Sequence, residues 1–189
     1  HGGHHSPGAI MALLRLATAA SRSATRCGAL PRRLVHTEAK IAELGYTLPS
    51  MPAALGLYVP AARLGNVIHT AGHIPFGDPL DPSTLYVGKV GLDYTVEEGQ
   101  NFARIIGLEL LATLKHELGD LDRVKRIVKV VGFVNCPNDF TNQPEVLNGC
   151  SELFGAVFGE RGIHSRSAVG TNSLPRNVPV EIELIAEVE

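Results

Sequence analysis

Residues 95–118 read TVEEGQNFARIIGLELLATLKHEL and carry the strongest structural signal in the chain. Thr95 and Glu98 have the spacing of a capping box, in which a hydroxyl and a carboxylate satisfy free N–H groups at the start of a helix. Apolar residues then recur every three or four positions, at Ala103, Ile106, Leu110, Leu111, Leu114 and Leu118. The sequence therefore predicts a long amphipathic helix that ends at Gly119.

The segment that follows predicts a buried strand and a second helix. Residues 127–135, IVKVVGFVN, form a β-branched run typical of a central strand. The helix is expected to have Thr141 as its N-cap, Pro144 in its first turn and Gly159 as its terminator. Its apolar side consists of Val146, Cys150, Leu153, Phe154 and Val157. Strands are then expected at 167–170 and 178–188, the second with apolar and acidic residues in alternation.

Upstream of the long helix, the sequence predicts a hairpin. Strand-like runs at 58–64 and 67–71 flank Gly65 and Asn66, whose small side chains suit a tight turn. A short helix is expected at 37–44, a loop at 75–82 and a further strand at 85–90.

These elements predict an α+β fold in which one mixed sheet has two helices packed on one face. The second face of the sheet would carry Val131, Phe133 and Ile185. We expect an oligomer interface to cover it, because apolar strand residues need a partner on both faces.

Composition indicates an ordinary soluble protein with a single domain at 37–189. The chain has 189 residues, of which 44% are hydrophobic and 19% charged, and no apolar run reaches the roughly 20 residues needed to span a bilayer. The first 37 residues contain five arginines and no acidic residue, so the remainder has 12 basic and 19 acidic residues, a net charge of −7. That acidic body disfavours nucleic acid, whose phosphates require Lys and Arg contacts.

The N-terminal residues read as processing segments. Residues 1–10, HGGHHSPGAI, look like an expression-tag remnant, and Met11 looks like the natural start. Residues 11–36 are rich in Arg, Ala, Ser and Leu, and their spacing places most of the arginines on one helix face. This pattern predicts a mitochondrial transit peptide and a mitochondrial location. The alternative is a disordered basic arm on a cytoplasmic protein.

Cysteines and histidines give no sign of a metal site. Cys27, Cys136 and Cys150 form no CxxC pair, so neither a disulfide framework nor a zinc knuckle is expected, and Cys150 is interpreted as a buried thiol. His69 and His73 are four residues apart on a strand and its exit. We therefore expect them not to share a face as metal ligands.

Residues 162–187, GIHSRSAVGTNSLPRNVPVEIELIAE, contain the candidate chemical groups. Arg166 directly precedes a predicted strand, where its planar fork suits a carboxylate, although a surface salt bridge is the alternative. Glu181 lies on the last strand and could equally be a solvated carboxylate. If both faced one pocket, an anion clamp and a group able to orient water would coexist, which is a hydrolytic arrangement.

Three segments carry a resemblance to a known family: MPAALGLYVPAARLGNVIHTAGHIP (51–75), VGFVNCPNDFTNQPEVLNGCSELF (131–154) and SRSAVGTNSLPRNVPVEIELIAEV (165–188). They resemble the reactive intermediate deaminase family, called RidA or YjgF, whose older members were labelled L-PSP endoribonucleases. The likeness runs from about residue 51 to 188. The extra loop at 77–90 is similar to that of a longer RidA-like subgroup.

The resemblance implies a homotrimer with a chorismate-mutase-like fold and ligand clefts between neighbouring subunits. It implies hydrolysis of enamine and imine intermediates, such as 2-aminoacrylate, to a 2-keto acid and ammonia, without a metal or organic cofactor. Arg166 would then hold the substrate carboxylate and Glu181 would orient the attacking water. Tyr58, Gly72 and Asn148 match pocket positions of the family.

Three residues depart from the family pattern. Ala71 replaces a serine, His73 replaces a glutamine, and Ala168 replaces a small polar or thiol residue. The pocket is expected to be less polar as a result, and His73 is a further candidate for a polar role. Two alternatives to the deaminase remain open: a non-catalytic trimer that binds small carboxylates, and an endoribonuclease, which the acidic body disfavours.

Overall fold

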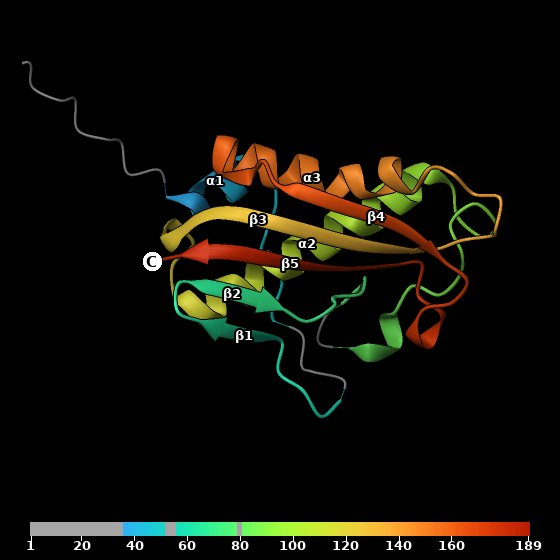
Figure 1. The fold of residues 1–189 in the computed structure, drawn as a ribbon, viewed down its shortest axis with the longest axis horizontal. Helices are drawn as coiled ribbons and strands as arrows, with labels where there is room; N and C mark the ends of the chain where they lie inside the picture. Colours follow the sequence, from blue (N-terminus) through green and yellow to red (C-terminus); the bar gives the residue numbers. More distant parts are fainter. Residues whose placement is uncertain (1–35, 52–55, 79–80) are drawn as a thin grey trace, which may run out of the picture. The chain divides into compact units, whose positions relative to one another are not determined.

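The computed structural model describes residues 36–51, 56–78 and 81–189, so residues 1–10 and all of the expected leader except His36 lie outside the described residues. Five strands form one sheet in the order β1-β2-β5-β3-β4 (Figure 1). The strands are β1 (Ala61–Leu64), β2 (Val67–Thr70), β3 (Val124–Asn135), β4 (Ser165–Thr171) and β5 (Val180–Val188). Only β3 and β4 pair in parallel, so the sheet is mixed, as predicted.

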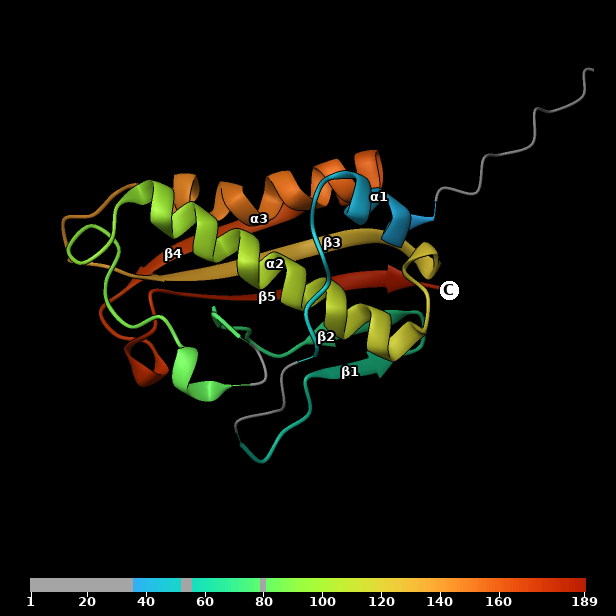
Figure 2. The same cartoon turned by 180° about the vertical axis from the view of Figure 1, so that it is seen from behind.

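The two long helices, α2 (Val96–Leu118) and α3 (Gln143–Phe158), lie side by side on one face of this sheet (Figures 1 and 2). The short helix α1 (Thr37–Glu43) packs near α3. The described residues also form four 3₁₀ turns: η1 (Pro82–Thr84), η2 (Leu121–Arg123), η3 (Gly159–Gly162) and η4 (Pro175–Asn177). The predicted α+β class is confirmed. Among the described residues, no helix combines the length and apolar character needed to cross a membrane.

Helix α2 begins and ends where the sequence predicts. The Thr95 hydroxyl accepts a hydrogen bond from the Glu98 amide, and the Glu98 carboxylate accepts one from the Thr95 amide at 2.8 Å. Gly119 ends the helix in the left-handed region at φ 79°, where glycine carries no Cβ penalty. All six predicted apolar positions of α2 are buried.

Helix α3 confirms its predicted core but not its predicted cap. Its five apolar positions are buried, and burial raises the pKa of the Cys150 thiol, as expected for a structural cysteine. The N-cap is Asn142 and not Thr141, because the helix starts one residue later than the sequence indicated. The Thr141 hydroxyl donates to the Asn142 side chain, which itself makes no capping bond.

The hairpin is confirmed, whereas the strand predicted at 85–90 is wrong. Gly65 takes φ 60° in the two-residue turn between β1 and β2, a conformation that suits glycine. The segment at 85–90 makes only isolated pairings, Phe76 with Leu85 and Val90 with Tyr94. Gly88 interrupts the extended backbone at φ 143°, and no strand ladder forms there.

The two faces of the sheet differ sharply in burial. Val130, Ile182 and Leu184 point toward the helices and are buried. The alternate residues of β3 and β5, among them Phe133 and Ile185, are only partly buried on the face that the described helices leave open (Figure 1).

Candidate functional site

Arg166 lies inside β4 and not before it, because the parallel pairing with β3 already begins at Ser165. It pairs with Val130, so its side chain leaves the sheet on the helix side. Its Nη1 donates to Asn148 Oδ1 and to Ser151 Oγ, each at 3.0 Å, and its Nη2 donates to the Pro144 carbonyl at 3.1 Å.

These three bonds leave two of the five guanidinium N–H groups unengaged by the described residues, one on Nε and one on Nη2. Nε and Nη2 are the pair of nitrogens that holds a carboxylate side-on. Within the part of the chain that the structure describes, no acidic side chain forms an ion pair with Arg166. The guanidinium is therefore fixed by neutral groups and has donors left for an anion.

Ala168 follows Arg166 on the same face of β4 and packs against the core. Further along this strand lies a cavity of about 420 Å³. It is lined by Cys136, Pro137, Asn138, Phe140, Gln143, Gly170, Thr171 and Asn172. A Cβ at Gly170 would lie 2.7 Å from Gln143 Nε2, so the glycine leaves this space open.

Glu181 forms a second cluster with Gly72. Glu181 pairs with Phe133 on the open face of the sheet, and a Cβ built on Gly72 would lie 2.0 Å from Glu181 Oε1. The carboxylate thus rests against the Gly72 main chain, and a side chain at position 72 would displace it. Partial burial raises the pKa of Glu181, and the neighbouring Glu183 raises it further, so this carboxyl takes up a proton more readily than an exposed glutamate.

His73 lies beneath this cluster, on the helix side. Its Nε2 is 2.8 Å from Thr113 Oγ1 and its Nδ1 is 2.9 Å from the Ala71 carbonyl. Burial lowers the pKa of His73, which favours the neutral ring. Its polar contacts therefore anchor the Gly72 loop to α2. His69 is exposed and pairs with Ile185 on the other face, so the two histidines do not share a face, as predicted.

Tyr58 lies in the exposed segment ahead of β1. Leu57 and Val59 beside it are also exposed. Leu57, Tyr58 and Val59 thus form a run of three exposed apolar or aromatic side chains.

The predicted site residues therefore form two clusters on opposite faces of the sheet. Arg166, Asn148 and Ala168 lie on the helix side of β4, and Glu181 and Gly72 lie on the open side of β5. Within one chain, Arg166 and Glu181 do not face a common space.

Ser151 and His164 were not predicted from the sequence as site residues. They contact each other behind Arg166, where His164 Nε2 lies 3.1 Å from Ser151 Oγ. The spacing held a signal: Ser151 follows Asn148 by three residues, which is one helical turn, and His164 precedes Arg166 by two, which is one strand repeat.

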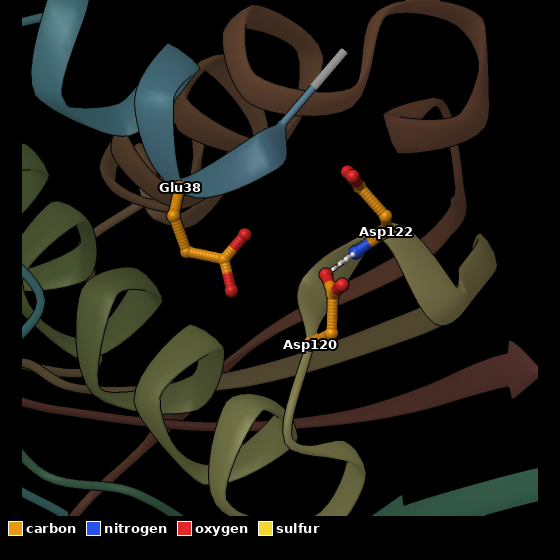
Figure 3. Close-up of side chains that lie close together, drawn as sticks. All are labelled: Glu38, Asp120 and Asp122. Atoms are coloured by element: carbon orange, nitrogen blue, oxygen red, sulfur yellow. Dashed lines mark hydrogen bonds between the residues drawn. The ribbon is translucent and has the colours of Figure 1, made fainter. Parts of the chain in front are cut away.

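A separate group of carboxylates, Glu38, Asp120 and Asp122, lies near α1 (Figure 3). Asp122 accepts hydrogen bonds from the Thr37 amide and hydroxyl, Glu38 accepts one from the Leu121 amide, and Asp120 accepts one from the Asp122 amide. These bonds fasten α1 to η2. They account for the proximity of the three carboxylates without any ligand.

Comparison with known proteins decides the family. Residues 38–188 match the family described as "YjgF/chorismate_mutase-like, putative endoribonuclease". The chain belongs to this YjgF family. Both the mixed sheet and the helices on one face agree with that assignment, and the resemblance noted in the sequence is confirmed.

Named relatives and a solved structure support the same assignment. Protein TCP17 of Trypanosoma cruzi is 40% identical over 79% of this chain and 92% of its own length. The 2-iminobutanoate/2-iminopropanoate deaminase of Escherichia coli K12 is 36% identical over 71% of this chain and 90% of its own. The crystal structure of Atu1372 from Agrobacterium tumefaciens, described as having unknown function, matches with a TM-score of 0.74 at 38% identity, over 82% and 94% of the two chains. This YjgF chain is thus similar to a deaminase over most of its folded part.

Proposed function

We propose that this YjgF protein hydrolyses small 2-imino acids and their enamine tautomers to 2-keto acids and ammonia. The observation that carries the proposal is the guanidinium of Arg166, which is held by neutral partners with N–H groups left on Nε and Nη2. A substrate carboxylate fits that fork in two parallel hydrogen bonds. Relatives named 2-iminobutanoate/2-iminopropanoate deaminase support the reaction class.

Glu181 supplies the proton transfers. Its raised pKa makes it a better proton acceptor than an exposed glutamate, as the proton transfers of the reaction require. An enamine takes a proton on its β-carbon to become the imine. Water then adds to the C=N carbon, and the resulting carbinolamine expels ammonia to leave the 2-keto acid. Glu181 orients that water and takes its proton, while Arg166 holds the carboxylate in place.

A complete site requires two copies of the chain, since Arg166 and Glu181 lie on opposite faces of the sheet. The open face, with Phe133 and Ile185, and the exposed segment around Tyr58 provide the surfaces for association. We propose a closed trimer, in which each cleft takes Arg166 and Asn148 from one copy and Glu181, Gly72 and Tyr58 from the next.

The test is ammonia release from an imine that an amino-acid oxidase generates in the assay from 2-aminobutanoate. Wild type is expected to exceed the spontaneous rate, and Arg166→Ala to lose about a hundredfold of that acceleration, since the substrate is no longer held in place. Arg104→Ala, which removes an arginine from α2, is the matched control and should keep the wild-type rate.

Two results would overturn the proposal. If wild type never exceeds the spontaneous rate but binds 2-oxobutanoate, and Arg166→Ala abolishes that binding, the protein is a carboxylate-binding module. If it cleaves RNA, and the cleavage co-elutes with the protein and is lost in Arg166→Ala, the older endoribonuclease label applies.

A further inference from the structure

A chain of hydrogen bonds runs behind the guanidinium of Arg166. The Gly162 carbonyl lies 2.7 Å from Nδ1 of His164, and Nε2 of His164 lies 3.1 Å from Ser151 Oγ. Ser151 Oγ in turn lies 3.0 Å from Nη1 of Arg166. These hydrogen bonds therefore connect η3, β4 and α3 at the guanidinium of Arg166.

The chemistry of the end groups fixes the direction of every bond. A carbonyl can only accept, so Nδ1 of His164 carries its proton and donates to Gly162. In the neutral ring Nε2 then accepts, and it must accept from the Ser151 hydroxyl. Because a hydroxyl that donates can still accept, Ser151 Oγ receives the N–H of Arg166. All four groups are satisfied without a conflict.

The surroundings of His164 favour its neutral form. The imidazole faces Ser151 and the ring of Phe154 on α3, the Gly162 carbonyl on η3 and the guanidinium of Arg166 on β4. Burial lowers the pKa of His164 most strongly; the bond to Gly162 opposes this, and the positive charge of Arg166 lowers it further. The ring centroids of His164 and Phe154 are 5.8 Å apart in an edge-to-face arrangement, which holds the imidazole in its plane.

We propose that Ser151 and His164 are positioning residues for Arg166: the relay from Gly162 through His164 and Ser151 stops rotation of the guanidinium and keeps its Nε and Nη2 donors turned toward the substrate carboxylate. The inference rests on the proposed function, because the carboxylate is the ligand that the oriented fork receives. Asn148 and the Pro144 carbonyl hold the same group from α3 but leave Nη1 with one partner if Ser151 is lost.

The relay also has a pH limit. A protonated His164 carries N–H groups on both ring nitrogens, so it can no longer accept from Ser151. Its charge would also face that of Arg166. Restraint of the guanidinium should therefore weaken on acidification, and His164→Gln, whose amide oxygen still accepts but does not titrate, should keep the restraint at low pH.

The first test needs no substrate. In the full chain labelled with ¹⁵N-arginine, a fixed guanidinium gives separate NMR signals for its two Nη groups, whereas a rotating one gives an average. The Arg166 signals are assigned by their loss in Arg166→Lys. We expect separate signals in wild type and His164→Gln, and averaged signals in Ser151→Ala and His164→Leu.

Ser165→Ala is the matched control, since this hydroxyl lies beside Arg166 but donates to the Val128 carbonyl outside the relay. Its Arg166 signals should remain those of wild type. Separate signals that persist in folded Ser151→Ala and His164→Leu would overturn the proposal.

The second test measures affinity for 2-oxobutanoate, the expected product. Ser151→Ala and His164→Leu should each weaken binding about tenfold, the order expected when a hydrogen bond to a charged group is lost. The double variant should be no weaker than either single one, because both break the same relay. In the enzyme assay, Ser151→Ala and His164→Leu should raise KM more than they lower kcat.

The two proposals can fail separately. If Arg166 is restrained in wild type and released in the variants, but wild type never accelerates ammonia release, the relay stands and the proposed function falls. If 2-oxobutanoate binds with equal affinity to wild type, Ser151→Ala and His164→Leu, the relay does not serve the ligand and the inference is wrong.

Discussion

Glu109 lies on α2 with its side chain fully buried, and among the described residues only one of its carboxylate oxygens has a partner. Oε1 accepts from the Phe76 amide at 3.3 Å, and Oε2 has no hydrogen bond. Burial raises the pKa of Glu109 to about 8, although the bond from Phe76 opposes the change. At neutral pH most of this carboxyl is therefore protonated and uncharged, which is the form that a buried site tolerates.

This environment predicts a pH-dependent stability. The folded chain binds the Glu109 proton more tightly than the unfolded chain. This proton therefore adds fully to the unfolding free energy below about pH 4.5, and the added stability is lost as the pH rises through 8. Glu109→Gln does not titrate. We expect the unfolding free energy of wild type relative to this variant to fall by up to about 1.4 kcal/mol per pH unit in that window. Urea denaturation from pH 5 to 9 measures it.

Glu152→Gln, at an exposed position of α3, is the control for the loss of one carboxylate. Parallel pH curves for wild type and Glu109→Gln would show that Glu109 is ionised in the folded protein. Such a result would mean that water gains access to the Glu109 carboxylate in the folded protein.

At the scale of elements, Gly149 lies where the backbones of α2 and α3 approach each other closely. A Cβ on Gly149 would lie 1.9 Å from the Gln100 carbonyl oxygen, which is backbone and cannot turn away. Gly149→Ala must therefore separate the helices, and we expect a loss of about 2–4 kcal/mol in unfolding free energy. Gly149 directly follows Asn148, which accepts a hydrogen bond from Arg166. The substitution should therefore shift Asn148 and Arg166 and lower the activity. Thermal and urea denaturation provide the measurement.

Gly155→Ala on the same helix is the matched control. No atom lies within 4 Å of its added Cβ beyond the helix's own backbone, so the better helix propensity of alanine should stabilise α3 by about 0.5–1 kcal/mol. Equal stabilities of the two variants would contradict the close approach of α2 and α3.

Elements with local sequence signals were predicted correctly. The predictions were wrong where pairing with another strand determines whether an element forms or where it begins. The cap at Thr95 and the stripe from Ala103 to Leu118 specify α2 by themselves, and the structure confirms them. Residues 85–90 have strand composition, but Gly88 bends the chain and no neighbouring strand pairs with it. Arg166 lies inside β4 because pairing with β3 sets that boundary, which the residues of β4 alone do not reveal.

The candidate site shows the same division. Arg166 and Glu181 could be named from the family resemblance, and strand alternation could have placed them on faces, but only the pairing of both strands with β3 shows that those faces are opposite. The relay through Ser151 and His164 required the packing of α3 against β4, which no sequence motif encodes.

For the whole molecule, the leader remains a prediction. We propose that residues 11–36 direct the protein to mitochondria, because an arginine-rich segment without acidic residues is drawn inward by the membrane potential. A fusion of these residues to a fluorescent protein should co-localise with a mitochondrial dye. Changing Arg15 and Arg22 to glutamate should leave the signal in the cytosol; cytosolic signal from the unchanged segment would contradict the prediction.

The last prediction concerns the assembly. If each cleft joins Arg166 of one copy to Glu181 of the next, two inactive variants can complement each other. The Arg166→Ala chain still supplies the Glu181 carboxylate, and the Glu181→Gln chain still supplies the Arg166 guanidinium. Every mixed trimer therefore has one cleft that contains both groups. In the mixed trimers one cleft of the three is intact, so the rate of imine hydrolysis should recover to about a third of wild type, as a closed three-fold ring requires.

Co-expression of the two variants under different affinity tags, followed by purification through both tags, isolates the mixed assemblies for the ammonia assay. Each variant purified alone is the control and should remain inactive. A site built within a single chain could not recover at all, because every chain in the mixture lacks one of the two groups. Recovered hydrolysis would therefore show that Arg166 and Glu181 act from different chains, as their placement on opposite faces of the sheet requires.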